Sequence, residues 1–284
     1  MKRLSAAVCA TAIISCGRVG FAPALSSDDA DTRASADAPT CLGHDEDGDG
    51  VADSCDNCPA TANVDQLDIG EIVNSAAADG VGDACDPRPS VAGDFITFFD
   101  ACDQPSSNFV YFGKVGYALD GMVLGGITAT GSAQLTYRAN MTRATTHIEI
   151  LEASVEVGPQ WAGFWYRNSD TDLRAVLASV NRNVGARPAI ADLDETVPGS
   201  ANNKSAPIAV APELLPSNSF TLTIDTPRLT AGGDSLRLQA STASISDSTT
   251  SVTLAPGDII GQPYLESSMI QTRFDYLIIY ASQN

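Results

Sequence analysis

Residues 220–224 read Phe-Thr-Leu-Thr-Ile, and the same alternation of apolar and polar side chains returns in Leu-Arg-Leu at 236–238. Successive side chains of a β-strand point to opposite faces, so this pattern predicts half-buried strands whose apolar side faces a core. Short runs of this kind follow one another from residue 93 to residue 284, separated by turn residues such as Asp120-Gly121. No stretch supports a long helix. The pattern therefore predicts an all-β fold, an antiparallel two-sheet jelly-roll sandwich.

Three parts of this region resemble concanavalin A-like sandwiches, the architecture of laminin G and lectin or glucanase domains. They are the turn at Asp120-Gly121 with the strand that ends at Leu124, a core strand over 162–167, and a closing strand over 274–280. The resemblance implies a sheet face that binds a glycan or a protein. The remaining predicted strands are DFITFF, NFVYF, VGYAL, AQLTYRA, THIEILEASVEV, LRAVLASV, SLRLQAS and TSVTLA.

Charge separates a smaller segment from the sandwich. The chain carries 35 acidic and 16 basic residues and a formal net charge of -19, which opposes binding to nucleic acid or to an anionic membrane surface and favours cations. Residues 41–87 hold no lysine or arginine, whereas residues 93–284 are only mildly acidic. The acidic segment is therefore expected to form a module of its own, and residues 88–92 to link it to the sandwich.

The stretch DEDGDGVADSCDNCP, residues 45–59, places carboxylates and a glycine with regular spacing. Numbered as a loop from Asp45, it has carboxylates at positions 1, 3, 5, 9 and 12, glycine at position 6, and a backbone carbonyl available at position 7. This is the ligand spacing of an EF-hand-type calcium loop, in which glycine permits the sharp turn. The candidate Ca²⁺ ligands of this loop are Asp45, Asp47, Asp49, Val51, Asp53 and Asp56.

The residues that follow differ from a helical EF-hand. Position 12 is Asp56 rather than Glu, no amphipathic helix flanks the loop, and the chain continues through DNCP, Asn63, Gln66 and Asp68 to DGVGDACD at 79–86. This pattern resembles the thrombospondin type 3 repeat. The resemblance implies calcium ions wrapped by backbone and carboxylates, with disulfides in place of a hydrophobic core.

The second half of the repeat departs from that family. Eleven steps separate Asp68 from Asp79 where the family has four, and Ser75 and Ala77 stand where carboxylates are expected. We predict a second calcium loop here, with Asp68 or Glu71 moving in to complete it. Its candidate ligands are Asp68, Asp79, Val81, Asp83 and Asp86.

Four cysteines flank the two loops, and four cysteines permit three disulfide connectivities. The resemblance implies Cys41–Cys55 and Cys58–Cys85, which an oxidising compartment would preserve. A redox CxxC at Cys55–Cys58 is disfavoured because acidic neighbours raise thiol pKa values, and zinc is disfavoured because a second CxxC is missing. Cys102 is left over and is expected to be a buried free thiol.

The N-terminus is typical of an export signal, with Lys2 and Arg3 before an apolar stretch too short to span a bilayer. The sequence Ile-Ile-Ser-Cys ending at Cys16 resembles a bacterial lipobox, which implies cleavage, acylation of Cys16 and, with Gly17 next, the outer membrane. Residues 1–16 would then be the signal and 17–40 a disordered tether. A conventionally cleaved, secreted protein is the alternative.

Residues for catalysis are few. Sandwich glucanases use two close carboxylates on an ExDxxE strand; here Glu149 and Glu156 are seven apart, and the polar face of a strand is the simpler interpretation. The chain has 2 histidines and no GxSxG elbow. Four aromatic residues are able to stack on a sugar ring: Trp161, Trp165, Tyr166 and Tyr111. Aromatic residues at alternating strand positions are more often part of the core, and we expect this for Trp165 or Phe164.

The sequence thus predicts a non-enzymatic, calcium-binding surface protein of the cell envelope, structural or adhesive, whose partners are calcium and a glycan or surface protein. The membrane is contacted only through the lipid anchor. A carbohydrate-active enzyme of the concanavalin A-like class and a non-binding spacer are the alternatives.

Overall fold

The structure, a computed structural model, describes residues 41–154, 159–167, 175–182, 189–196, 204–210, 215–225, 235–242, 245–253 and 260–283. The predicted signal, the predicted tether and Glu156 lie outside these residues. No helix in the described part of the chain is long and apolar enough to cross a membrane.

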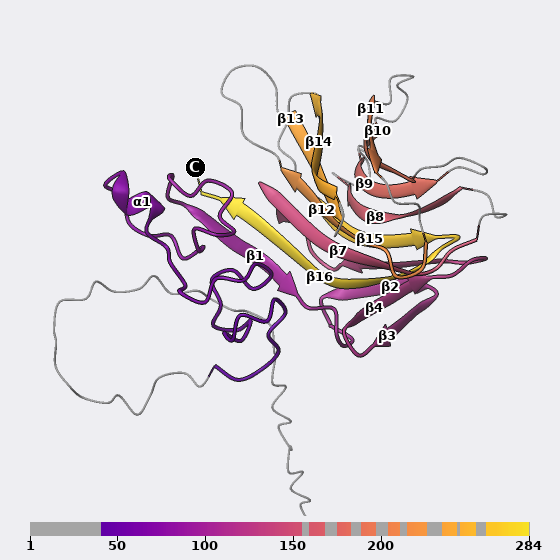
Figure 1. The fold of residues 1–284 in the computed structure, drawn as a ribbon, viewed down its shortest axis with the longest axis horizontal. Helices are drawn as coiled ribbons and strands as arrows, with labels where there is room; N and C mark the ends of the chain where they lie inside the picture. Colours follow the sequence, from indigo (N-terminus) through magenta and orange to yellow (C-terminus); the bar gives the residue numbers. More distant parts are fainter. Residues whose placement is uncertain are drawn as a thin grey trace, which may run out of the picture.

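The described chain forms two antiparallel sheets of eight strands each, preceded by a small module with one short helix, α1 (Gly70–Val73) (Figure 1). The predicted fold class, an all-β antiparallel sandwich with a disulfide-stapled N-terminal module, is confirmed. In the first sheet the order is β14, β13, β12, β7, β16, β4 and β3, and β1 also pairs with β16. Its strands are β1 (Asp94–Asp100), β3 (Val115–Ala118), β4 (Gly121–Gly125), β7 (Arg143–Glu152), β12 (Ser219–Asp225), β13 (Ser235–Thr242), β14 (Ile245–Thr253) and β16 (Gln271–Ser282).

The second sheet has the order β11, β10, β9, β8, β15, β5 and β2, with β6 also paired to β15. The sequence pattern does not predict three of its strands, namely β10, β11 and β15. Its strands are β2 (Phe109–Gly113), β5 (Thr130–Leu135), β6 (Ala139–Asn140), β8 (Gln160–Arg167), β9 (Ala175–Arg182), β10 (Ala189–Thr196), β11 (Lys204–Val210) and β15 (Ile260–Ser268).

The main core lies between the sheets and follows the predicted alternation. Along β7, buried and partly exposed residues alternate from Arg143 to Leu151, and along β12 the apolar residues Phe220, Leu222 and Ile224 are buried. Each such side chain contributes about 1.5–3 kcal/mol by leaving water. Other members of this core are Phe98, Phe109, Leu124, Leu135, Ile148, Ile150, Phe164, Tyr166, Val180, Leu265, Phe274, Leu277 and Ile279.

Strand β16 is buried on both of its faces for most of its length. Its first residues pair with β4 and its last with β1 along one edge, while β7 runs along the other edge. A second apolar cluster forms on the face away from the main core, where Ile278 and Tyr280 pack with Cys58, Val81 and Cys85 of the module. The N-terminal module therefore rests on the outer face of the first sheet, beside β1 and β16 (Figure 1).

Polar contacts tie the module to the sandwich as well. Arg88 donates to Asp94, its Nη2 lying 2.8 Å from Oδ1, and Arg143 of β7 donates to Asp225 at 2.6 Å and to the carbonyl of Cys85 at 3.2 Å. Because Arg143 joins two strands and the module at once, the module and the first sheet share one polar network.

Candidate metal centre and aromatic sheet face

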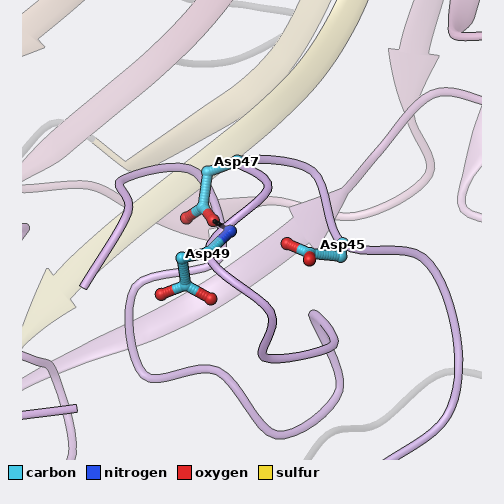
Figure 2. Close-up of side chains that lie close together, drawn as sticks. All are labelled: Asp45, Asp47 and Asp49. Atoms are coloured by element: carbon cyan, nitrogen blue, oxygen red, sulfur yellow. Dashed lines mark hydrogen bonds between the residues drawn. The ribbon is translucent and has the colours of Figure 1, made fainter. Parts of the chain in front are cut away.

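The first loop brings three of its predicted ligands together. Ligand oxygens of Asp45, Asp47 and Asp49 lie within 4.8 Å of one another, and Figure 2 shows the three side chains gathered in one turn of the chain. Backbone amides hold them there: the amides of Gly48 and Gly50 donate to the two carboxylate oxygens of Asp45 at 2.9 and 3.0 Å. Gly50 has φ +94, a conformation that favours glycine, as its place in the loop predicts.

The other predicted ligands of this loop are placed differently. Asp56 is buried, and its Oδ2, like Oδ2 of Asp47, has no hydrogen-bond partner within the described chain. Asp53 lies outside the three-residue group, and its two carboxylate oxygens accept hydrogen bonds from the amide of Glu46 at 2.9 Å and the ring of His44 at 3.0 Å. Val51 donates its amide to Asp49 at 2.8 Å.

Electrostatics show that these carboxylates are crowded. Burial raises the pKa of Asp47, and the charges of Asp56 and Asp49 raise it further, although the Asp49 amide opposes the shift. Burial likewise raises the pKa of Glu46 to about 8, with the charge of Asp275 on β16 adding to it. A divalent cation would offset the repulsion that adds to these shifts.

The second loop forms around one residue that lies outside the predicted ligand set. Glu71 of α1 is fully buried, and its carboxylate lies within 4.8 Å of two groups of ligand atoms, one from Asp68 and Asp83 and the other from Asp79 and Asp86. The loop spacing did not assign Glu71 a ligand position, but the sequence already indicated it as a residue able to move in and complete the loop. It is the sole carboxylate in residues 69–78.

Backbone amides position the predicted ligands of the second loop. Asp68 accepts from Gly80 at 2.8 Å and Asp86 from Arg88 at 2.6 Å, and each keeps its other oxygen buried with no donor in the described structure. Burial raises the pKa of Asp68 to about 6 and that of Asp86 to about 8, and neighbouring Glu71 adds to both shifts. The remaining amide contacts are Val81, Gly93 and Asp94 to Asp79, and Ile69 and Gly70 to Asp83.

A disulfide closes each of the two loops, and side-chain amides connect the residues between them. The disulfides are Cys41–Cys55 and Cys58–Cys85, the pairing that the resemblance implies, and Cys102 is a buried free thiol as predicted. Between the loops, Asn63 donates to Asn57 at 2.7 Å, and the Gln66 amide donates to Asp56 and Asn63 at 2.8 Å each. The donor set is made of oxygen atoms on short, cross-linked loops, which fits Ca²⁺ rather than a thiolate-seeking metal.

The outer face of the second sheet carries a row of aromatic rings. On β8, Phe164 and Tyr166 enter the main core, so Trp161 and Trp165 face the other way, where they are half-buried. The expectation of a core position therefore holds for Phe164, while Trp165 lies on the opposite face. Trp165 stacks on Tyr264 of β15, with ring centroids 5.7 Å apart and planes inclined by 4°.

The row has further members and polar neighbours. The Trp161 and Trp165 rings meet edge to face at 5.5 Å, and strand pairing places Gly163, which has no side chain, opposite Glu266 of β15. Ser132 of β5 pairs with Glu266 on one side and with Phe112 of β2 on the other, so the Phe112 side chain, which is 53% exposed, lies on the same face. The arrangement is a partly apolar surface with polar groups set into it.

The residues considered for catalysis lie elsewhere. Glu149 is on the outer face of the first sheet and pairs with Arg273, whose Nη2 is 2.9 Å from the carboxylate, and His147 on the same face contacts Asp275 at 2.5 Å. Glu149 is thus part of the polar face of a strand, as the simpler interpretation holds.

Tyr111, one of the four aromatic residues considered for sugar stacking, packs against the main core and hydrogen-bonds to the backbone of Ser106.

Comparison with known proteins adds only distant structural likenesses. No family model matches the chain, and no curated protein matches it. Among solved structures, the Lotus tetragonolobus seed lectin has a TM-score of 0.48 at 8% identity, covering 66% of this chain and 99% of that one. Lectin I-B4 from Griffonia simplicifolia in its metal-free form has a TM-score of 0.48 at 10% identity, covering 68% and 100%. The carbohydrate-binding module CBM66 from Bacillus subtilis has a TM-score of 0.41 at 14% identity, covering 62% and 96%.

Proposed function

We propose that this protein is an exported, calcium-binding carbohydrate-binding protein of the cell envelope. The observation that carries the proposal is the row of rings formed by Trp161, Trp165 and Tyr264 on the outer face of the second sheet. Small-ligand sites combine apolar and aromatic surface with a few placed polar groups. A pyranose presents an apolar face of C–H groups and an edge of hydroxyls, which suits rings beside Glu266 and Ser268.

The calcium module supports the sandwich rather than the sugar site. It lies on the outer face of the first sheet, across the core from the aromatic row. Calcium bound by Asp45, Asp47, Asp49 and Asp56 would neutralise clustered carboxylates and order the first loop. In this proposal calcium holds the module rigid against β16, and the aromatic face selects the ligand.

The remaining features extend the proposal to the cell surface. The resemblance of residues 45–86 to a thrombospondin type 3 repeat supports a calcium-bound spacer, and two disulfides suit an extracytoplasmic compartment. Acylation of Cys16 would anchor the protein to the outer membrane, with residues 17–40 as tether. An adhesive role follows, in which the sandwich presents its aromatic face at a distance from the membrane.

A glycan array, followed by affinity measurement on the best ligand in millimolar calcium, tests the carbohydrate site. Trp161→Ala should weaken binding by about 2 kcal/mol, or roughly 30-fold, because it removes an aromatic contact surface. Leu119→Ala, at a 94% exposed position between β3 and β4, is the matched control and should bind normally. An array without a single bound glycan, or equal affinity of the two variants, would remove the carbohydrate proposal.

A further inference from the structure

The helix α1 buries its acidic side chain and exposes its apolar ones, the opposite of the usual distribution. Its acidic residue, Glu71, is fully buried, whereas its apolar residues Ile72 and Val73 are 54% and 81% exposed. Burying a carboxylate costs far more than leaving two aliphatic side chains in water, unless the charge is compensated. The orientation of α1 therefore cannot come from the hydrophobic effect, and something inside the module must favour the carboxylate.

Protein groups do not supply that compensation. Both carboxylate oxygens of Glu71 lack a hydrogen-bond partner among the described residues. Its close neighbours in the two groups are four aspartates, whose charges repel it. Arg88, the basic residue that directly follows the module, directs its guanidinium to Asp94, although its charge also interacts with Asp86 and Asp79.

Two of the neighbouring aspartates show the same incomplete bonding. Asp68 uses Oδ2 to accept from Gly80 and keeps Oδ1 buried with no donor, and Asp86 uses Oδ1 to accept from Arg88 and keeps Oδ2 buried in the same way. Each carboxylate is thus fixed by the backbone through one oxygen while the other oxygen faces the interior. The two groups that share Glu71 therefore contain four buried oxygens, from three residues, that no backbone or side-chain donor satisfies while the carboxylates are ionised. Oxygen atoms left in this way are suited to bind a cation.

The insertion is built to hold Glu71 at this place. The amides of Ile69 and Gly70 both donate to Oδ1 of Asp83, at 3.1 and 2.9 Å. A Cβ atom at Gly70 would lie 1.8 Å from the carbonyl oxygen of Pro89, so only glycine lets the chain approach so closely. The residues that lengthen the second loop therefore hydrogen-bond to Asp83, one candidate ligand, and contain Glu71, another.

We propose that Glu71 is a cation ligand shared by two adjacent calcium positions, one completed by Asp68 and Asp83 and the other by Asp79 and Asp86. This inference rests on the proposed calcium-binding function. Glu71 replaces the carboxylates that are missing at Ser75 and Ala77. The five carboxylates carry five negative charges, which two Ca²⁺ ions would almost neutralise. Backbone carbonyls or water would complete the roughly 6 to 8 oxygen ligands that each Ca²⁺ takes.

The test compares the purified full-length protein with Glu71→Gln, which keeps the size of the side chain and removes its charge. Equilibrium dialysis with ⁴⁵Ca²⁺ should show fewer tightly bound ions in the variant, with the affinity of the affected positions reduced about tenfold or more. Asp65→Asn is the matched control: Asp65 is exposed, lies in the same module and belongs to neither group. It should bind as many ions as the unaltered protein.

A stability readout separates a ligand from a residue needed only for packing. At pH 9, where the neighbouring carboxyl groups are ionised, and without calcium, Glu71→Gln should unfold at a higher denaturant concentration than the unaltered protein, because a repelled buried charge is gone. With calcium the unaltered protein should be the more stable of the two. Glu71→Asp, which keeps the charge but shortens the side chain, should lose calcium affinity without the gain in the calcium-free state. A variant less stable in both conditions would overturn the assignment.

The possible failures are distinguishable. Unchanged calcium stoichiometry in Glu71→Gln, with Asp47→Asn losing an ion, would overturn the role of Glu71 and leave the first loop intact. Calcium binding absent from every form, including the unaltered protein, would overturn the calcium function itself.

Discussion

Substituting alanine for both Cys58 and Cys85 should destabilise the sandwich as well as the module. This disulfide closes a loop with a sequence separation of 27, and the loss of that constraint on the unfolded chain corresponds to about 3.5 kcal/mol. The effect should reach the sandwich because both cysteines are buried against Ile278 and Tyr280 of β16, the strand that pairs with three others.

Tryptophan fluorescence provides a selective probe for this effect. The chain has 2 tryptophans, Trp161 and Trp165, and both lie on β8 of the second sheet, away from the module. With an m-value of about 2–3 kcal/mol/M in urea, the calcium-loaded double variant should show a midpoint lower by between about 1 and 2 M. A single transition is expected, since module and sandwich share a packed interface.

The other disulfide provides the comparison. Cys41 is exposed, and neither Cys41 nor Cys55 belongs to the cluster on β16, so the end of the module is able to open locally without unfolding the sandwich. The alanine pair at these positions should change the fluorescence midpoint less than the pair at Cys58 and Cys85. If the Cys58 and Cys85 variant kept the normal midpoint while its module became sensitive to protease, the integral packing argued for the module would be wrong.

Three further outcomes are expected. Gly50→Ala should cost about 1–2 kcal/mol of strain at a positive φ and weaken calcium binding about tenfold, whereas Gly116→Ala, at an open position, should do neither; calcium titration checks both. Burial raises the pKa of Asp68 to about 6 and that of Asp86 to about 8 from the ordinary 3.8, so the calcium-free folded protein binds more protons than the unfolded chain. The stability that these two groups contribute should be complete below pH 3.8 and lost as the pH rises to about 8, and calcium affinity should rise over the same range. Unfolding curves at several pH values, with and without calcium, would measure both changes. Burial also raises the pKa of the Cys102 thiol, so a thiol reagent should modify it in the folded protein only as fast as the fold opens, which absorbance kinetics would follow.

Alternation in the sequence was sufficient for the fold class and for most strands, and the exceptions have physical reasons. Strand β15 contains Pro263, which normally argues against an interior strand because it lacks an amide donor. The fold tolerates it because β5 ends at Leu135 and β6 begins at Ala139, so β15 has no ladder partner on that side at Pro263. Gln262 fills the gap by donating its side-chain amide to the Leu135 carbonyl at 2.6 Å. Strand β10 is rich in alanine and aspartate, which have low strand propensity.

The sequence predicts the first calcium loop better than the aromatic row, because only the loop depends on contacts between residues that are close in the chain. Carboxylates at fixed short spacing converge through local turns, so the grouping of Asp45, Asp47 and Asp49 follows from the sequence. Phe164 and Trp165 are neighbours on β8, so only one of them faces the other sheet and enters the core. Because both residues are apolar, the sequence alone does not decide which one it is. The stacking of Trp165 on Tyr264 depends on the pairing of β8 with β15, a strand that alternation did not reveal.

Glu71 is the case in which sequence and structure have to be combined. The sequence indicated Glu71 as a residue able to move in and complete the second loop, but it did not predict α1 or the positions of Ile72 and Val73 beside it. In the structure Glu71 is buried and Val73 is exposed, which fits the proposed ligand role because Ser75 and Ala77 stand where the resemblance expects carboxylates. An insertion that lengthened the loop at random would have no reason to bury its one acidic residue among four others. We therefore interpret the long second loop and the absence of carboxylates at Ser75 and Ala77 together: in the proposed arrangement, Glu71 of α1 takes the role that the resemblance assigns to those two positions.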